Sequence, residues 1–327
     1  MIITPFITQL EDHLKQRDLC ESSITSYIRT LINLHNKIEG NEKIKNLNFL
    51  IKTDLVEENI KDYKDNTKKT IYNTLCSILY PHKDKKKYKI TYNFYKEKSE
   101  DINKEIKSII NENIKSKKEN ENWITWDEVM DIKTKLEEES ETDKKYLNEK
   151  QYNLLLHNVV LSLYVNIPPR RNEYLKLNII AKKEHATDDK NYFVYDEDLL
   201  ILRDYKTSKK YGSIDIEINE NLKKDIHNYL KYHKIFNSSK KKKKYEVPFF
   251  VNHQGVEIIS NNAITRILNK IFNKNIGATM LRHIYLTDKY GKELEDRKED
   301  ADKMGHSLNM QTDYIKSGVS PPYDEDE

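Results

Sequence analysis

The spacing of apolar residues changes once along this chain, and that change limits the folds that it can adopt. From the N-terminus to about residue 118, apolar residues recur every three or four positions, as on one face of a helix. One such run is Ile24, Tyr27, Ile28, Leu31 and Ile32. Strand-like segments, including an alternation with a period of two, follow between about residues 192 and 218. We therefore expect a mainly α fold with one small antiparallel β-sheet.

The polar stretch 113–121 divides the chain into two parts. Its sequence, NIKSKKENE, is almost free of apolar residues, which is typical of a linker. With 327 residues, the chain is long enough for two domains of ordinary size. We predict a helical domain over residues 1–118 and a second domain over residues 119–327, with Thr125 as the cap of an early helix in the second domain.

Composition sets limits on location and partners. There is no run of 18 apolar residues, and the opening MIITPFITQLEDHL has acids where a signal peptide would be basic and then apolar. The two cysteines, Cys20 and Cys76, are too few for a disulfide framework or a thiolate metal site. We expect an intracellular protein in a reducing compartment, without a membrane partner. The net charge of +3 is weak evidence for a nucleic-acid binder, because the local patch governs attraction to phosphate.

Two arginine motifs lie in the second part. The first, RRNEYLKL at 170–177, follows two prolines that end the preceding helix, so Arg170 begins a new element. We expect Glu173, Leu175 and Leu177 on a helix that follows it. The second, TMLRH at 279–283, contains Arg282, which lies in a helix that we expect over residues 281–290. Arginine suits phosphate because its planar fork donates two parallel hydrogen bonds and stays charged. Taken alone, Arg170 is better interpreted as a surface residue paired with Glu173.

A third motif, GHSLNMQTDY at 305–314, changes that interpretation. A single histidine or one of 22 tyrosines is more often a structural residue than a catalytic one. Two fixed cations followed by His306 and Tyr314 are, however, what an enzyme needs to attack a phosphodiester with tyrosine. Tyr323, nearer the end of the chain, is a rival to Tyr314, but it follows two prolines in an acidic tail.

Lysines occur in three places that deserve separate interpretations. The segment KTSKKYG at 206–212 has the turn residues of a β-hairpin between two strand-like segments. This segment carries Lys206, Lys209 and Lys210. The runs 83–89 and 240–244 are interpreted as solvated loops.

In this order, the motifs resemble the tyrosine recombinase (integrase) family. The family signature is an arginine in R-x-x-E with leucines following, a hairpin lysine, H-x-L-R-H, and then L-G-H-S with the nucleophilic tyrosine about nine residues beyond that histidine. The N-terminal part resembles the core-binding domain of the family. The sequence NWITWDEV at 122–129 is similar to the L-T-x-E-E-V segment that begins the catalytic domain, so the resemblance covers most of the chain.

Carried over position by position, the resemblance implies six site residues. They are Arg170, Lys206, Thr279, Arg282, His306 and Tyr314. Lys206 takes the place of the hairpin lysine, with Lys209 and Lys210 as open alternatives. Two of the six residues depart from the family. Thr279 stands where a histidine is usual, and a hydroxyl cannot hold a proton near neutral pH. Tyr314 follows His306 by eight residues rather than nine.

The resemblance implies a site-specific recombinase that cuts and rejoins double-stranded DNA through a 3′-phosphotyrosyl bond. It implies no cofactor and no metal, and a homotetramer assembled on DNA. The alternatives are a type IB topoisomerase and a DNA-binding relative that has lost catalysis. The phrases PPRRNEYLKL and DYKTSKKYG, with the Lys, Asn, Ile and Tyr bias, are similar to integrases of large DNA viruses or their mobile elements. Such an enzyme would act in viral genome integration, at DNA in the host nucleus or cytoplasm.

Overall fold

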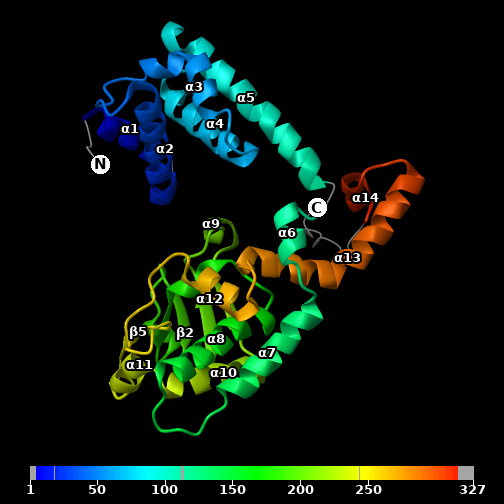
Figure 1. Cartoon of the computed structure of the whole chain (residues 1–327). Helices are drawn as coiled ribbons and strands as arrows, with labels where there is room; N and C mark the ends of the chain where they lie inside the picture. Colours follow the sequence, from blue (N-terminus) through cyan, green and yellow to red (C-terminus); the bar gives the residue numbers. More distant parts are fainter. Residues whose placement is uncertain (1–4, 18, 112–113, 243, 316–327) are drawn as a thin grey trace, which may run out of the picture. The chain divides into compact units, whose positions relative to one another are not determined.

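The computed structural model describes residues 5–17, 19–111, 114–242 and 244–315 (Figure 1). The chain divides into two compact units, Met1–Lys115 and Ser116–Glu327. As predicted, the described fold is mainly helical and contains one sheet. Among the described helices, none combines the length and the apolar character that a membrane span requires.

The described part of the first unit is helical. Its elements are α1 (Pro5–Lys15), α2 (Glu21–Glu39), η1 (Asn48–Ile51), α3 (Thr53–Ile60), α4 (Asp65–Leu79), η2 (Tyr80–His82) and α5 (Lys86–Asn111). α4 packs along α5, and α2 contacts α1, α3 and α4. Residues at the predicted helical spacing, such as Ile24, Ile28 and Leu31, form the core of this unit.

The basic run 83–89 is only partly a loop. Helix α5 begins at Lys86, so the second half of the run forms the first turn of that helix. The side chains of Lys86, Lys87 and Lys89 are exposed there. The prediction of a loop was therefore wrong for these residues, although their exposure to solvent is as expected.

The second unit contains the sheet and the remaining helices. The helices are α6 (Lys117–Asn122), α7 (Trp126–Ser140), α8 (Glu149–Val165), α9 (Ser208–Tyr211), α10 (Glu220–Lys231), α11 (Lys234–Ser239), α12 (Ala263–Phe272), α13 (Ala278–Met304) and α14 (Leu308–Tyr314). Short 3-10 helices, η3 (Asn172–Lys176) and η4 (Lys183–His185), flank the first strand. Thr125 caps α7 as predicted: Glu128 N donates to its Oγ1 at 3.2 Å, and Thr125 N donates to the Glu128 carboxylate at 2.7 Å.

The sheet has the strand order β4-β3-β2-β1-β5. Its strands are β1 (Leu177–Ile180), β2 (Asn191–Val194), β3 (Leu199–Leu202), β4 (Ile214–Glu217) and β5 (Glu246–Pro248). The β3–β4 hairpin agrees with the sequence prediction. The sheet is mixed rather than antiparallel, because β1 and β2 run parallel. The sequence interpretation missed β1 because it placed Leu177 in a helix after Arg170, whereas LNII is an apolar run suited to a buried strand.

Helix α8 forms the centre of the second unit. It packs against α7, α10 and α12, and nearly all of its residues after Leu154 are buried. One face of the sheet, with Ile179, Phe193 and Leu200, belongs to the same core. Arg170 lies in the short segment that joins this buried helix to η3 and the first strand of the sheet.

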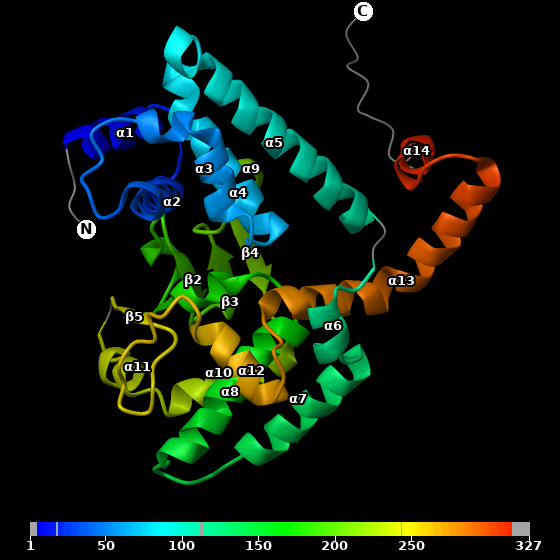
Figure 2. The ribbon, with the colours of Figure 1, turned by 45° about the horizontal axis from the view of Figure 1, so that its top comes forward.

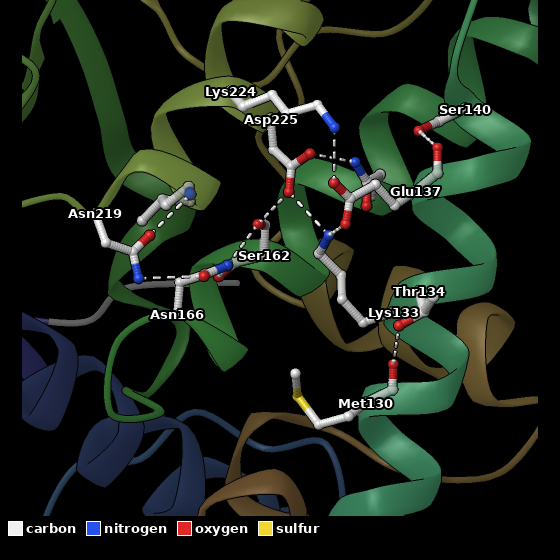
Figure 3. A network of polar contacts seen from close by, with 12 residues as sticks. Met130, Lys133, Thr134, Glu137, Ser140, Ser162, Asn166, Asn219, Lys224 and Asp225 are labelled. Atoms are coloured by element: carbon white, nitrogen blue, oxygen red, sulfur yellow. Dashed lines mark hydrogen bonds and ion pairs between the residues drawn. The ribbon is translucent and has the colours of Figure 1, made fainter.

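A buried polar network joins α7, α8 and α10 (Figure 3). The carboxylate of Asp225 accepts hydrogen bonds from Asn158 Nδ2 at 2.8 Å and from Ser162 Oγ at 2.5 Å. The ammonium group of Lys133 lies 2.9 Å from the same carboxylate and 3.0 Å from that of Glu137. The buried ion pair therefore joins α7 to α10, and the hydrogen bonds from Asn158 and Ser162 add α8 to the network.

Candidate active site

Arg170 lies where the chain passes from α8 to η3. Its guanidinium carbon is 5.0 Å from the centre of the Tyr205 ring, in a cation–π contact. Its Nε is buried and has no hydrogen-bond partner among the described residues. Because Tyr205 directly precedes Lys206, the structure places the first arginine beside the hairpin loop that carries the candidate lysine.

Glu173 and Tyr174 lie in the turn that follows Arg170. Both are buried, and Glu173 Oε2 and the Tyr174 hydroxyl have no partner in the part of the chain that the structure describes. No ion pair joins Glu173 to Arg170 among those residues, so the simple interpretation as a surface pair does not hold. Burial raises the pKa of Tyr174, while the nearby positive charge of Arg170 acts in the opposite direction.

The loop between β3 and β4 carries the three candidate lysines. Lys206, Lys209 and Lys210 are all exposed, so exposure does not distinguish them. Lys209 and Lys210 belong to α9, within the loop. Lys206 alone follows the buried residue that contacts Arg170, and this position favours it.

Arg282 lies in the second turn of α13 and is partly buried. Thr279, one turn earlier, is exposed, whereas Leu281 and Ile284 are buried in the core. Helix α12 packs against both η3 and α13. The segments of the two arginines are therefore linked through α12.

His283, next to Arg282, makes a contact that the sequence interpretation missed. Its Nδ1 lies 2.7 Å from Glu119 Oε1, while the other carboxylate oxygen of Glu119 accepts from Ser116 N at 2.8 Å. The pKa of Glu119 is lowered: burial opposes this shift, but the hydrogen bonds from Ser116 and His283 outweigh burial. Helix α6, at the start of the second unit, is thereby attached to the helix of Arg282. No spacing rule connects residues so far apart in sequence.

The GHS motif joins α13 to α14. Gly305 ends α13 with φ 67°, a left-handed conformation that glycine adopts at little cost. Ser307 then caps α14 by accepting a hydrogen bond from Met310 N at 3.3 Å. Arg297 of α13 donates to Gln311 Oε1 at 3.0 Å and to Thr312 Oγ1 at 2.6 Å, which holds α14 against α13.

This connection brings His306 and Tyr314 together. Their ring centres are 5.7 Å apart in an edge-to-face arrangement. Tyr314 is 64% exposed. Buried Nδ1 of His306 has no hydrogen-bond partner among the described residues. The rival Tyr323 lies outside the described residues.

The structure does not bring His306 and Tyr314 to the same place as Arg170, the Lys206 loop and Arg282. Helix α13 is continuous from Ala278 to Met304, so about 33 Å of helix separates Arg282 from its C-terminal end, at 1.5 Å per residue. In both views α14 lies at the end of α13 that is remote from α12 (Figure 2). The sequence predicted only residues 281–290 as helix. Arg170 and the Lys206 loop thus form one group, and His306 and Tyr314 form another.

No metal site is evident in the part of the chain that the structure covers, since no three His, Cys, Asp or Glu side chains are placed there to hold an ion. The candidate site consists of the arginines, the lysine loop, the histidine and the tyrosine described above. Comparison with known proteins finds no matching family model, curated protein or solved structure.

Proposed function

We propose that this protein is a tyrosine-type site-specific recombinase acting on double-stranded DNA. The observation that carries the proposal is the pairing of the candidate residues. Arg170 lies beside the Lys206 loop, and an exposed Tyr314 lies against His306. Exposed lysines at the start of α5 supply positive charge suited to the DNA backbone. Each half of a phosphoryl-transfer site is thus supported by a contact as well as by a motif.

In the proposed reaction, the Tyr314 oxygen attacks a DNA phosphorus and forms a 3′-phosphotyrosyl bond as the bond to the 5′ oxygen breaks. The phenolic proton passes to a base, and the adjacent His306 imidazole can accept it. Arg170 and Arg282 stabilise the charge on the non-bridging oxygens. Lys206 protonates the leaving 5′ oxygen. Attack of a 5′ hydroxyl reverses these steps and reseals the strand, so the reaction needs no nucleotide cofactor.

The experiment that tests this function is capture of a covalent adduct. The protein is incubated with a library of nicked duplexes of random sequence, in which the short 5′-hydroxyl fragment diffuses away after cleavage. Adducts that survive denaturing detergent are isolated and their DNA is sequenced. An enriched sequence supports a recombinase. Binding without any adduct supports a DNA-binding relative that has lost catalysis. Thr279, and the separation of His306 and Tyr314 from the arginines, would also suit such a relative. Relaxation of supercoils without joining of two duplexes would indicate a topoisomerase.

Both arginines are expected to affect the rate more than binding. Arg170→Ala and Arg282→Ala should each slow adduct formation about 100-fold to 1,000-fold, because each removes a charged donor from the transition state. The rate is measured on the selected duplex, with affinity measured by gel shift. Arg171→Ala, at an exposed neighbouring position, should remain within about twofold of wild type. Equal losses in all three variants would contradict the assigned roles.

The length of α13 favours delivery of Tyr314 to the arginines of another copy of the chain. Reacting atoms must approach to about 3–3.5 Å, and an unbroken α13 keeps Tyr314 far from its own Arg282. We therefore expect a mixture of Arg282→Ala and Tyr314→Phe proteins to form adduct, although each is inactive alone. A size tag on the Arg282→Ala copy should show that this copy carries the DNA.

The double variant Arg282→Ala/Tyr314→Phe is the matched control. Mixed with either single variant it should stay inactive, because every copy then lacks the same group. A mixture of the single variants that stays inactive, while wild type reacts, would show that the tyrosine serves its own chain. That result would require α13 to bend.

A further inference from the structure

Tyr205 connects two candidate groups that come from separate segments of the chain. The face of its ring contacts the Arg170 guanidinium, 5.0 Å from carbon to ring centre. Its hydroxyl donates to Gly212 O, at the other end of the loop, at 2.7 Å. The side chain of Tyr205 is buried, although Gly212 itself is exposed.

The hydrogen bond to Gly212 closes the loop that carries Lys206. Gly212 ends α9 with φ 70°, where the chain turns back into β4. Within the loop, Ser208 N donates to Tyr205 O at 3.1 Å. Tyr205, the first residue of the 205–212 segment, is therefore hydrogen-bonded through its hydroxyl to the last residue of that segment.

The start of the loop is fixed from a different side. The buried Asn191 side chain accepts from Arg203 N and from Asp204 N, each at 2.8 Å, and donates to Asp204 O at 2.8 Å. These bonds hold the backbone immediately before Tyr205. Tyr205 thus has a defined position, from which it can orient both Arg170 and Lys206.

We propose that Tyr205 is a positioning residue with two separable roles. This proposal rests on the recombinase function proposed above. Its ring holds the Arg170 guanidinium where a phosphate would bind. Its hydroxyl holds the loop so that Lys206 reaches the leaving oxygen. The two roles predict different chemical defects when the hydroxyl or the whole ring is removed.

The test compares Tyr205→Phe with Tyr205→Leu on two forms of the selected nicked duplex. One form has the natural 5′ bridging oxygen, and the other has sulfur at that position. A thiolate leaves without being protonated, so the sulfur substrate bypasses the need for a general acid. Lys206→Ala should be restored by sulfur and Arg170→Ala should not, and these variants calibrate the assay.

Tyr205→Phe keeps the ring and loses the bond to Gly212. It should cleave the oxygen substrate about tenfold more slowly than wild type. This loss is smaller than the roughly 100-fold to 10,000-fold rate increase that a general acid contributes, because Lys206 is displaced rather than removed. With the sulfur substrate, its rate should return to that of wild type. Tyr205→Leu should be slowed about 100-fold or more on oxygen, and sulfur should recover only the part due to Lys206. Tyr211→Phe, an exposed tyrosine of the same loop, should match wild type on both substrates.

Several results would overturn the proposal. A Tyr205→Phe rate equal to wild type on oxygen removes the role of the hydroxyl, and full recovery of Tyr205→Leu by sulfur removes the role of the ring. Tyr205→Met replaces the leucine variant if the latter does not fold. If wild type forms no adduct with any duplex, the recombinase function fails and the role of Tyr205 fails with it. If wild type and the calibrating variants behave as expected, only the role of Tyr205 is in question.

Discussion

Tyr314→Phe protein is expected to form no covalent adduct with the selected nicked duplex, while its affinity for that duplex stays close to that of wild type. The substitution removes only the hydroxyl oxygen that would bond to phosphorus, and the ring that contacts His306 remains. The side chain is largely exposed, so folding should not change. Adduct is measured on denaturing gels, and mass spectrometry of a protease digest identifies the modified peptide.

Tyr323→Phe is the control for this experiment, since Tyr323 is the rival tyrosine in the sequence. It should form adduct at the wild-type rate. Adduct that persists in Tyr314→Phe and disappears in Tyr323→Phe would assign the nucleophile to Tyr323. Adduct that persists in both variants would contradict the use of either tyrosine.

Much of the fold could be predicted because it depends on local patterns. Helical spacing identified the core positions Ile24, Ile28 and Leu31, and the turn residues of KTSKKYG identified the β3–β4 hairpin. The parallel pairing of β1 and β2 could not be predicted in this way. It depends on contacts between strands, and LNII reads equally well as part of a buried helix.

The candidate site could also be predicted only in part. The sequence motifs identified Arg170, Lys206, Arg282, His306 and Tyr314. The residues that hold them in place came only from the structure. The contact of Arg170 with Tyr205 and that of Glu119 with His283 join residues distant in sequence, and no periodicity relates such pairs. The unbroken course of α13 was also missed, because Gly291 favours a helix end on propensity alone while its charged neighbours continue the helix.

Contacts between residues distant in sequence also hold the interior of the second unit together. We expect the largest effect of a substitution on stability there. Asp225→Ala should lower the free energy of unfolding of this unit by about 3–5 kcal/mol. The side chains of Asp225 and Lys133 are only 1% and 6% exposed. Removing the carboxylate leaves the Lys133 ammonium with Glu137 alone and leaves the donors of Asn158 and Ser162 without their acceptor. Urea unfolding followed by tryptophan fluorescence measures the loss, because both tryptophans, at 123 and 126, belong to the second unit.

Two further variants separate the buried charge from simple loss of packing. Lys135→Ala, on the same helix, removes a lysine that is 75% exposed and 3.9 Å from Glu139, so it should change stability by less than about 0.5 kcal/mol. The double variant Lys133→Met/Asp225→Leu replaces the ion pair by apolar side chains and should recover most of the stability lost in Asp225→Ala. A double variant as unstable as Asp225→Ala would show that shape, rather than an unpaired ammonium, causes the loss. A loss below about 1 kcal/mol in Asp225→Ala would mean that Glu137 alone can balance Lys133, and that the three helices do not depend on the network.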